Sequence, residues 1–185
     1  MDKKILLCIF AILSVFTIAS CNGDKNTSTG LSNNNNSEIL LNCGTPTVYG
    51  GNTLFDTEWK LFGFFDAEKN KLVAPERIDC EDCYTLGFSL DSTGVLSNRE
   101  YGIAGGVMVI NGFTAYYIAD YTLSTIYFHD KLSTLIAETH DGNKYSNALF
   151  GGGSRTFELM DACLKLYYND KKDYLLYILR SNNEI

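Results

Sequence analysis

Cysteine is the residue type in this sequence whose spacing allows the widest range of chemistry. Cys80 and Cys83 form a Cys-Glu-Asp-Cys motif, which could exchange disulfides or supply half of a zinc site. A redox motif would stand at the start of a helix, whereas this one runs directly into the alternating segment 84–88. A zinc site would need a second closely spaced pair, and Cys43 and Cys163 stand alone. We therefore predict structural disulfides or buried thiols at these four positions, with three full pairings open.

The histidines and carboxylates offer little support for catalysis. His129 and His140 are each followed by an aspartate, but neighbours in sequence are not a dyad in space, and no serine lies in a nucleophile-elbow context. Glu138 and Asp141 could act as acid and base, although capping of a helix by Asp141 explains them better. The run Gly151–Gly153 lacks the Lys-Ser/Thr of a phosphate loop. We predict no catalytic residue, no cofactor site and no metal site.

Ser92 is a candidate site for modification. Asp91-Ser92-Thr93 resembles the short signal for O-glycosylation in Bacteroidetes. Because Asp91–Gly94 is rich in turn-forming residues, we expect this segment to be an exposed hairpin turn.

The first twenty residues have the three zones of a signal peptide. Lys3 and Lys4 precede the apolar run Ile5–Ile18, which is shorter than the about twenty residues that a membrane-spanning helix needs. Ile18-Ala19-Ser20-Cys21 then resembles a bacterial lipobox, in which the cysteine is acylated and becomes the mature N-terminus. An ordinary secretory signal or a signal anchor is the alternative. We expect residues 1–20 to be removed and Cys21 to carry the lipid.

A polar tether follows the proposed lipidation site. Residues 21–44 include an asparagine-rich stretch, Asn22–Ser37, which has too few apolar side chains to fold. A flexible chain of this length has an r.m.s. reach of roughly 20–25 Å. Some lipoproteins carry an acidic cluster just after the lipidated cysteine that directs them to the cell surface. Asp24 is the one acid of this stretch, so it matches that signal only weakly. We expect a lipid-anchored protein of the cell envelope, at the outer membrane, with the membrane face left open.

The charge of the chain limits its partners. The net charge is −7, and removal of Asp2, Lys3 and Lys4 makes it one unit more negative. This negative net charge opposes binding to nucleic acid or to an anionic membrane surface. We expect a monomer that meets the membrane through its N-terminal lipid and contacts an envelope protein or glycan.

Residues 45–185 are predicted to form one mostly β domain. Aromatic residues and glycines are frequent, and prolines are few. The candidate strands are 57–64, 84–90, 95–97, 105–110, 114–118, 124–128, 155–160, 163–168 and 174–179. Residues 141–149 place Tyr145, Ala148 and Leu149 on one face of a short helix. About eight short strands and one helix predict an antiparallel barrel-like or sandwich domain.

Several of these segments resemble META-type domains, which occur in small bacterial envelope lipoproteins. The similar features are Trp59 in the first strand, residues 93–98 followed by Gly102, then Glu138, Tyr145, Leu149 and the terminal segment 164–168. The Gly-Cys-Asn motif of that family is absent from this chain. The resemblance implies a META-like β domain in an envelope protein that is not an enzyme.

Two functions are compatible with such a domain. A binding module would present exposed tyrosines to a protein or glycan, and the candidates are Tyr116, Tyr117, Tyr121 and Tyr127. A lipocalin-like carrier would hold a small apolar ligand inside an open barrel. An interior filled by Trp59, Phe88 and Leu166 would argue against the carrier. We expect the binding module.

Overall fold

The computed structural model describes Cys43 and residues 53–180. The predicted signal peptide (residues 1–20), the lipidation site Cys21 and the tether up to residue 42 lie outside the described residues.

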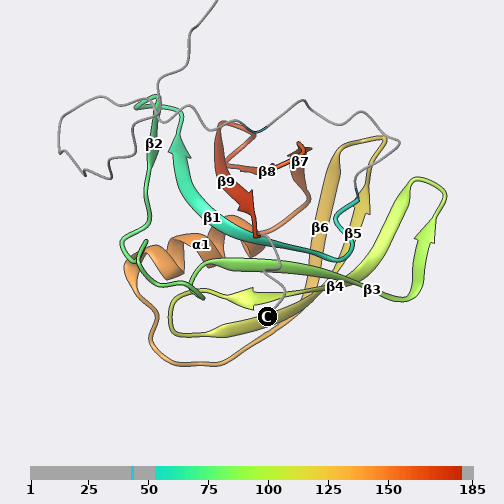
Figure 1. Ribbon diagram of the computed structural model, residues 1–185, viewed down its shortest axis with the longest axis horizontal. Helices are drawn as coiled ribbons and strands as arrows, with labels where there is room; N and C mark the ends of the chain where they lie inside the picture. Colours follow the sequence, from blue (N-terminus) through green and yellow to red (C-terminus); the bar gives the residue numbers. More distant parts are fainter. Residues whose placement is uncertain (1–42, 44–52, 181–185) are drawn as a thin grey trace, which may run out of the picture. The chain divides into compact units, whose positions relative to one another are not determined.

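Eight antiparallel strands close into a barrel, and one further strand and one helix are added to it (Figure 1). The elements are β1 (Thr57–Asp66), β2 (Lys71–Val73), β3 (Thr85–Leu96), β4 (Arg99–Val107), β5 (Gly112–Asp120), β6 (Thr125–Ser133), α1 (His140–Phe150), β7 (Arg155–Leu159), β8 (Cys163–Tyr168) and β9 (Asp173–Leu179). Strands β3 to β9 each pair with the next, β3 pairs with β1, and β1 pairs with β9 to close the ring. The short β2 pairs with the far end of β1. The predicted fold class is confirmed.

Aromatic and aliphatic side chains fill the barrel interior. Trp59, Phe88 and Leu166 are all buried and belong to one continuous core. Tyr84 and Tyr145 pack edge to face within it, with ring centroids 5.7 Å apart. The interior that the described residues form is therefore packed with side chains.

One buried carboxylate interrupts this apolar interior. Glu100 is 0% exposed, and its side chain accepts hydrogen bonds from the hydroxyls of Tyr117 and Tyr121. The hydroxyl of Tyr121 in turn accepts a hydrogen bond from the backbone N–H of Leu54, at 2.7 Å. Because an unpaired buried carboxylate would be costly, this network is what makes Glu100 compatible with the core.

The predicted turn at Asp91–Gly94 is wrong. These residues lie inside β3, where the register with β4 shifts between Leu90 and Val95. The Asp91 carboxylate accepts hydrogen bonds from the N–H groups of Thr93 and Gly94, so the turn chemistry forms a bulge and not a chain reversal. The reversal follows at Ser97 and Asn98, between β3 and β4.

The helix lies where the periodicity predicts it, but its cap differs. Thr139 is the N-cap, and its hydroxyl accepts a hydrogen bond from the N–H of Gly142 at 3.0 Å. Asp141, predicted as the cap, is in the first turn and accepts a hydrogen bond from the N–H of Glu76. Tyr145, Ala148 and Leu149 are buried as predicted. In the described part of the chain, no helix is long and apolar enough to cross a membrane.

The four cysteines form two disulfides of very different span. Cys43 is bonded to Cys163 across 120 positions of the chain, and Cys80 is bonded to Cys83 across 3. The first joins the segment before the barrel to the first residue of β8. In the chain-entropy model, the longer loop contributes more to stability because it restricts the unfolded chain more.

We expect Cys43→Ser to lower the free energy of unfolding by about 2–5 kcal/mol, since it removes the long-range disulfide. Urea denaturation followed by circular dichroism measures this loss. The Cys80→Ser variant is the control and should lose less, because its disulfide closes a loop of three positions. Equal losses in the two variants would contradict this assignment.

We expect stability to fall as the pH rises from about 10 to 12. Burial raises the pKa of Tyr84 and of Tyr168 to about 12, so both side chains ionise later in the folded protein than in the unfolded chain. The stabilisation is fully present below the ordinary tyrosine pKa and disappears as the pH approaches the raised value. Urea unfolding at a series of alkaline pH values measures the trend. A flat profile across this range would refute it.

Candidate binding groove

Four neighbouring strands share one continuous outer face. Side chains of a strand alternate between the two faces of the sheet, so residues paired across strands point the same way. Gly87 pairs with Gly105, which pairs with Thr114. Two residues along the strands, Ile103 pairs with Tyr116, which pairs with His129. These two rows run side by side across β3, β4, β5 and β6.

A shallow groove follows the glycine row. It has a volume of about 400 Å³ and is open to solvent. Its lining contains two carboxylates, four hydroxyls and no cationic side chain: Asp56, Thr57, Glu58, Thr85, Gly87, Phe88, Ser89, Ile103, Gly105, Gly106 and Thr114. The chemistry of this lining disfavours an anionic ligand and offers acceptors for the hydroxyl groups of a ligand.

Two glycines keep the floor of the groove open although packing does not require them. A Cβ atom at Gly87 would lie 3.7 Å from its nearest neighbour, and one at Gly105 would lie 3.6 Å away. By contrast, a Cβ at Gly106 would meet the carbonyl oxygen of Thr85 at 2.1 Å. Glycine inside a strand weakens it and often marks a place that a ligand approaches closely. Packing therefore does not explain why positions 87 and 105 are glycine.

An aromatic row borders the groove beyond Ile103. The rings of Tyr116 and Tyr127 each lie 5.7 Å from the ring of His129 and are tilted from it by 21° and 17°. Tyr116 is 46% exposed and Tyr127 is 43% exposed, as the sequence predicts for a binding surface. The row supplies apolar surface at the rim of a polar groove.

The other two tyrosines proposed as contacts are not exposed. Tyr117 is buried, and Tyr121 is half-buried against the core. Tyr116 and Tyr117 are consecutive in β5, so strand alternation sends one outward and the other inward to Glu100. Tyr121 follows β5, and its hydroxyl also donates to Glu100, so the prediction of exposed contacts was wrong for Tyr117 and Tyr121.

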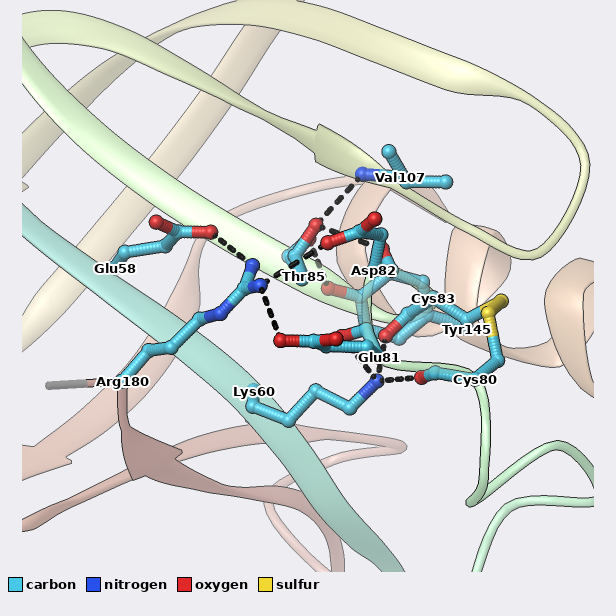
Figure 2. Close-up of polar contacts among 10 residues, drawn as sticks. All are labelled: Glu58, Lys60, Cys80, Glu81, Asp82, Cys83, Thr85, Val107, Tyr145 and Arg180. Carbon is cyan, nitrogen blue, oxygen red and sulfur yellow. Dashed lines mark hydrogen bonds and ion pairs between the residues drawn. A yellow bond between two sulfur atoms is a disulfide. The ribbon is translucent and has the colours of Figure 1, made fainter. Parts of the chain in front are cut away.

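A network of charges fixes the acidic wall of the groove (Figure 2). The Arg180 guanidinium donates to the Glu58 carboxylate at 2.7 Å and to the Asp82 carboxylate at 3.0 Å. Hydrogen bonding to Asp82 contributes most to raising the pKa of Arg180. Arg180 therefore joins the groove residue Glu58 to the Cys80–Cys83 loop.

The disulfide loop is itself held by Lys60. The Lys60 ammonium donates hydrogen bonds to the backbone carbonyls of Cys80, Glu81 and Cys83 (Figure 2). Burial, together with the nearby charge of Arg180, lowers the pKa of Lys60. The Cys-Glu-Asp-Cys motif thus forms a loop close to Arg180 and is followed in sequence by β3 and not by a helix.

The remaining predicted site residues are spread over the surface. Glu138 accepts hydrogen bonds from the N–H groups of Ile110 and Asn111, while Asp141 is bonded to Glu76. Burial opposes the ionisation of Glu138, but its hydrogen bonds outweigh burial and lower its pKa. Ser92 is exposed in the β3 bulge. In residues 53–180 and Cys43, no group of three or more His, Cys, Asp or Glu side chains is placed to hold a metal ion.

Comparisons with known proteins identify no relative. No protein-family model, no curated protein and no solved structure matches this chain.

We expect Gly87→Ala and Gly105→Ala to leave the fold intact and to raise the free energy of unfolding by about 0.5–1 kcal/mol, because glycine weakens a strand. Gly102→Ala is the matched comparison, since its Cβ would lie 2.0 Å from the carbonyl oxygen of Ser89. That variant should lose about 1–3 kcal/mol through overpacking. Thermal and urea unfolding of the three variants measure the difference. Destabilisation by all three would mean that the fold, and not a ligand, requires the open floor.

Proposed function

We propose that this protein is a binding module of the cell envelope that takes an uncharged glycan in the outer-face groove. The observation that carries the proposal is the open floor at Gly87 and Gly105, which packing does not require. Carboxylate and hydroxyl oxygens along the groove can accept hydrogen bonds from sugar hydroxyls. The row formed by Tyr116, His129 and Tyr127 offers apolar surface for the faces of sugar rings.

The chemistry of the groove favours a glycan partner over a protein partner. A peptide that adds to a sheet needs an open strand edge, but the strands beneath the groove are paired on both sides. A phosphate-bearing ligand would need cations, and the groove lining has none. A neutral, hydroxyl-rich molecule fits these constraints best.

The packed barrel interior also favours binding at the surface over transport of an apolar ligand inside the barrel. A carrier needs an internal cavity, whereas Trp59, Phe88 and Leu166 are packed together in the barrel. We therefore place the ligand on the outer face.

The proposal includes attachment to a membrane. The order of charge, apolar run, small residues and Cys21 supports acylation at Cys21, and the resemblance to META-type domains supports an envelope location. Two or three acyl chains on Cys21 would hold the protein at the membrane, with the asparagine-rich stretch as the tether between lipid and barrel.

We expect the protein to bind neutral oligosaccharides on a glycan array, with affinities then measured by titration calorimetry. Gly105→Val fills the floor and should abolish binding, while Tyr116→Ala should weaken it by about threefold to tenfold. Lys172→Ala, on the β8–β9 turn, is the control and should bind as the wild type does. Oligomers of uronic acids should bind less well than neutral ones. Wild-type affinity in Gly105→Val would refute the groove as the site.

A further inference from the structure

A cluster of aliphatic side chains projects from one end of the barrel. Ile110 lies on the β4–β5 connection, and Leu132, Leu135 and Ile136 lie at the end of β6 and on the connection to α1. Their exposed fractions are 47%, 74%, 96% and 62%. We name these four residues the apolar tip. So much exposed aliphatic surface in one place is unusual for a soluble surface and indicates an interaction.

Hydrogen bonds hold the two connections together, so the apolar tip has a defined shape. Asn111 is 2% exposed, and its amide both donates to the carbonyl of Ile136 at 2.8 Å and accepts from the N–H of Ile136 at 2.9 Å. The same amide oxygen accepts from the hydroxyl of Thr134, and the Glu138 carboxylate accepts from the N–H of Ile110. The backbone is thereby fixed with its aliphatic side chains facing solvent.

The chemistry of the apolar tip matches hydrocarbon better than a protein surface. Segments 108–112 and 132–137 contain no charged residue and no aromatic residue. Protein interfaces depend mainly on tryptophan, tyrosine and arginine, and the apolar tip has none of these. Aliphatic side chains gain free energy simply by leaving water for an acyl layer.

We propose that the apolar tip inserts into the surface layer of a phospholipid bilayer and holds this end of the barrel against the membrane. The length of chain before the barrel supports this occupant. If Cys21 carries lipid, residues 21–44 have a reach of roughly 20–25 Å, which keeps the barrel within its own diameter of the bilayer. The net charge of −7 directs the apolar tip to zwitterionic rather than anionic lipid. Leu132 pairs with the groove residue Thr114, so the apolar tip adjoins the groove, but the inference does not require a ligand there.

The experiment places a tryptophan in the apolar tip of the mature protein and mixes the protein with phosphatidylcholine vesicles. The native Trp59 is 2% exposed, so it reports little of the surroundings. We expect the fluorescence of Leu135→Trp to shift to shorter wavelength and to be quenched by lipids brominated in their acyl chains. Leu123→Trp is the matched control because Leu123 is 64% exposed on the β5–β6 turn, at the opposite end of these strands. Its emission should stay that of a tryptophan in water.

A second substitution tests the energetics. Ile136→Ser added to Leu135→Trp should reduce the inserted fraction about tenfold, since one buried aliphatic side chain is lost. Absence of quenching at position 135, or equal quenching at 123, would overturn the proposal. A shift that appears without vesicles and grows with protein concentration would also overturn it, because the apolar tip would then bind a second copy. Mass spectrometry of the N-terminus reports separately whether Cys21 is acylated.

Discussion

The pairing of the first barrel strand with the last is the constraint on which the rest of this structure depends. Strands β1 and β9 are joined from Trp59–Leu179 to Phe65–Tyr174, so each of the eight barrel strands has a neighbour on both sides. Closure of the ring separates an inner face from an outer face along every strand. Large side chains from the inner face fill the interior. What remains for recognition is the outer face and the connections at the two ends.

The separation of inner and outer faces explains why one polar network is buried and another lies at the surface. Glu100 faces inward and is matched by the hydroxyls of Tyr117 and Tyr121, which compensate it without a cation. Glu58 faces the groove and is matched by Arg180, a residue that follows β9. The partners of Glu100 come from the neighbouring strand of the β4–β5 hairpin and the residue that follows it, whereas the partner of Glu58 lies 122 positions away in the chain. Barrel closure accounts for the second contact, because β1 and β9 pair at Trp59 and Leu179, next to Glu58 and Arg180.

Local patterns in the sequence predict most of the elements of this fold. The alternation of 163–168, the turn at 169–172 and the face formed by Tyr145 and Leu149 all reappear in the structure. The β3 bulge does not follow from sequence, because Asp91 and Gly94 have the same local chemistry in a bulge as in a hairpin. The groove is harder still to predict. Gly87 and Gly105 become neighbours only through the register of β3 and β4, which a single sequence does not reveal.

The long disulfide also determines how the barrel would respond to mechanical force. A pull on the chain before Cys43 is transmitted through the sulfur bond to Cys163, at the start of β8. Strand β8 is hydrogen-bonded to β7 on one side and to β9 on the other. Tension applied there therefore enters the barrel directly at β8. Because β8 is held by a neighbour on each side, a pull applied before Cys43 does not act on the barrel through β1 alone.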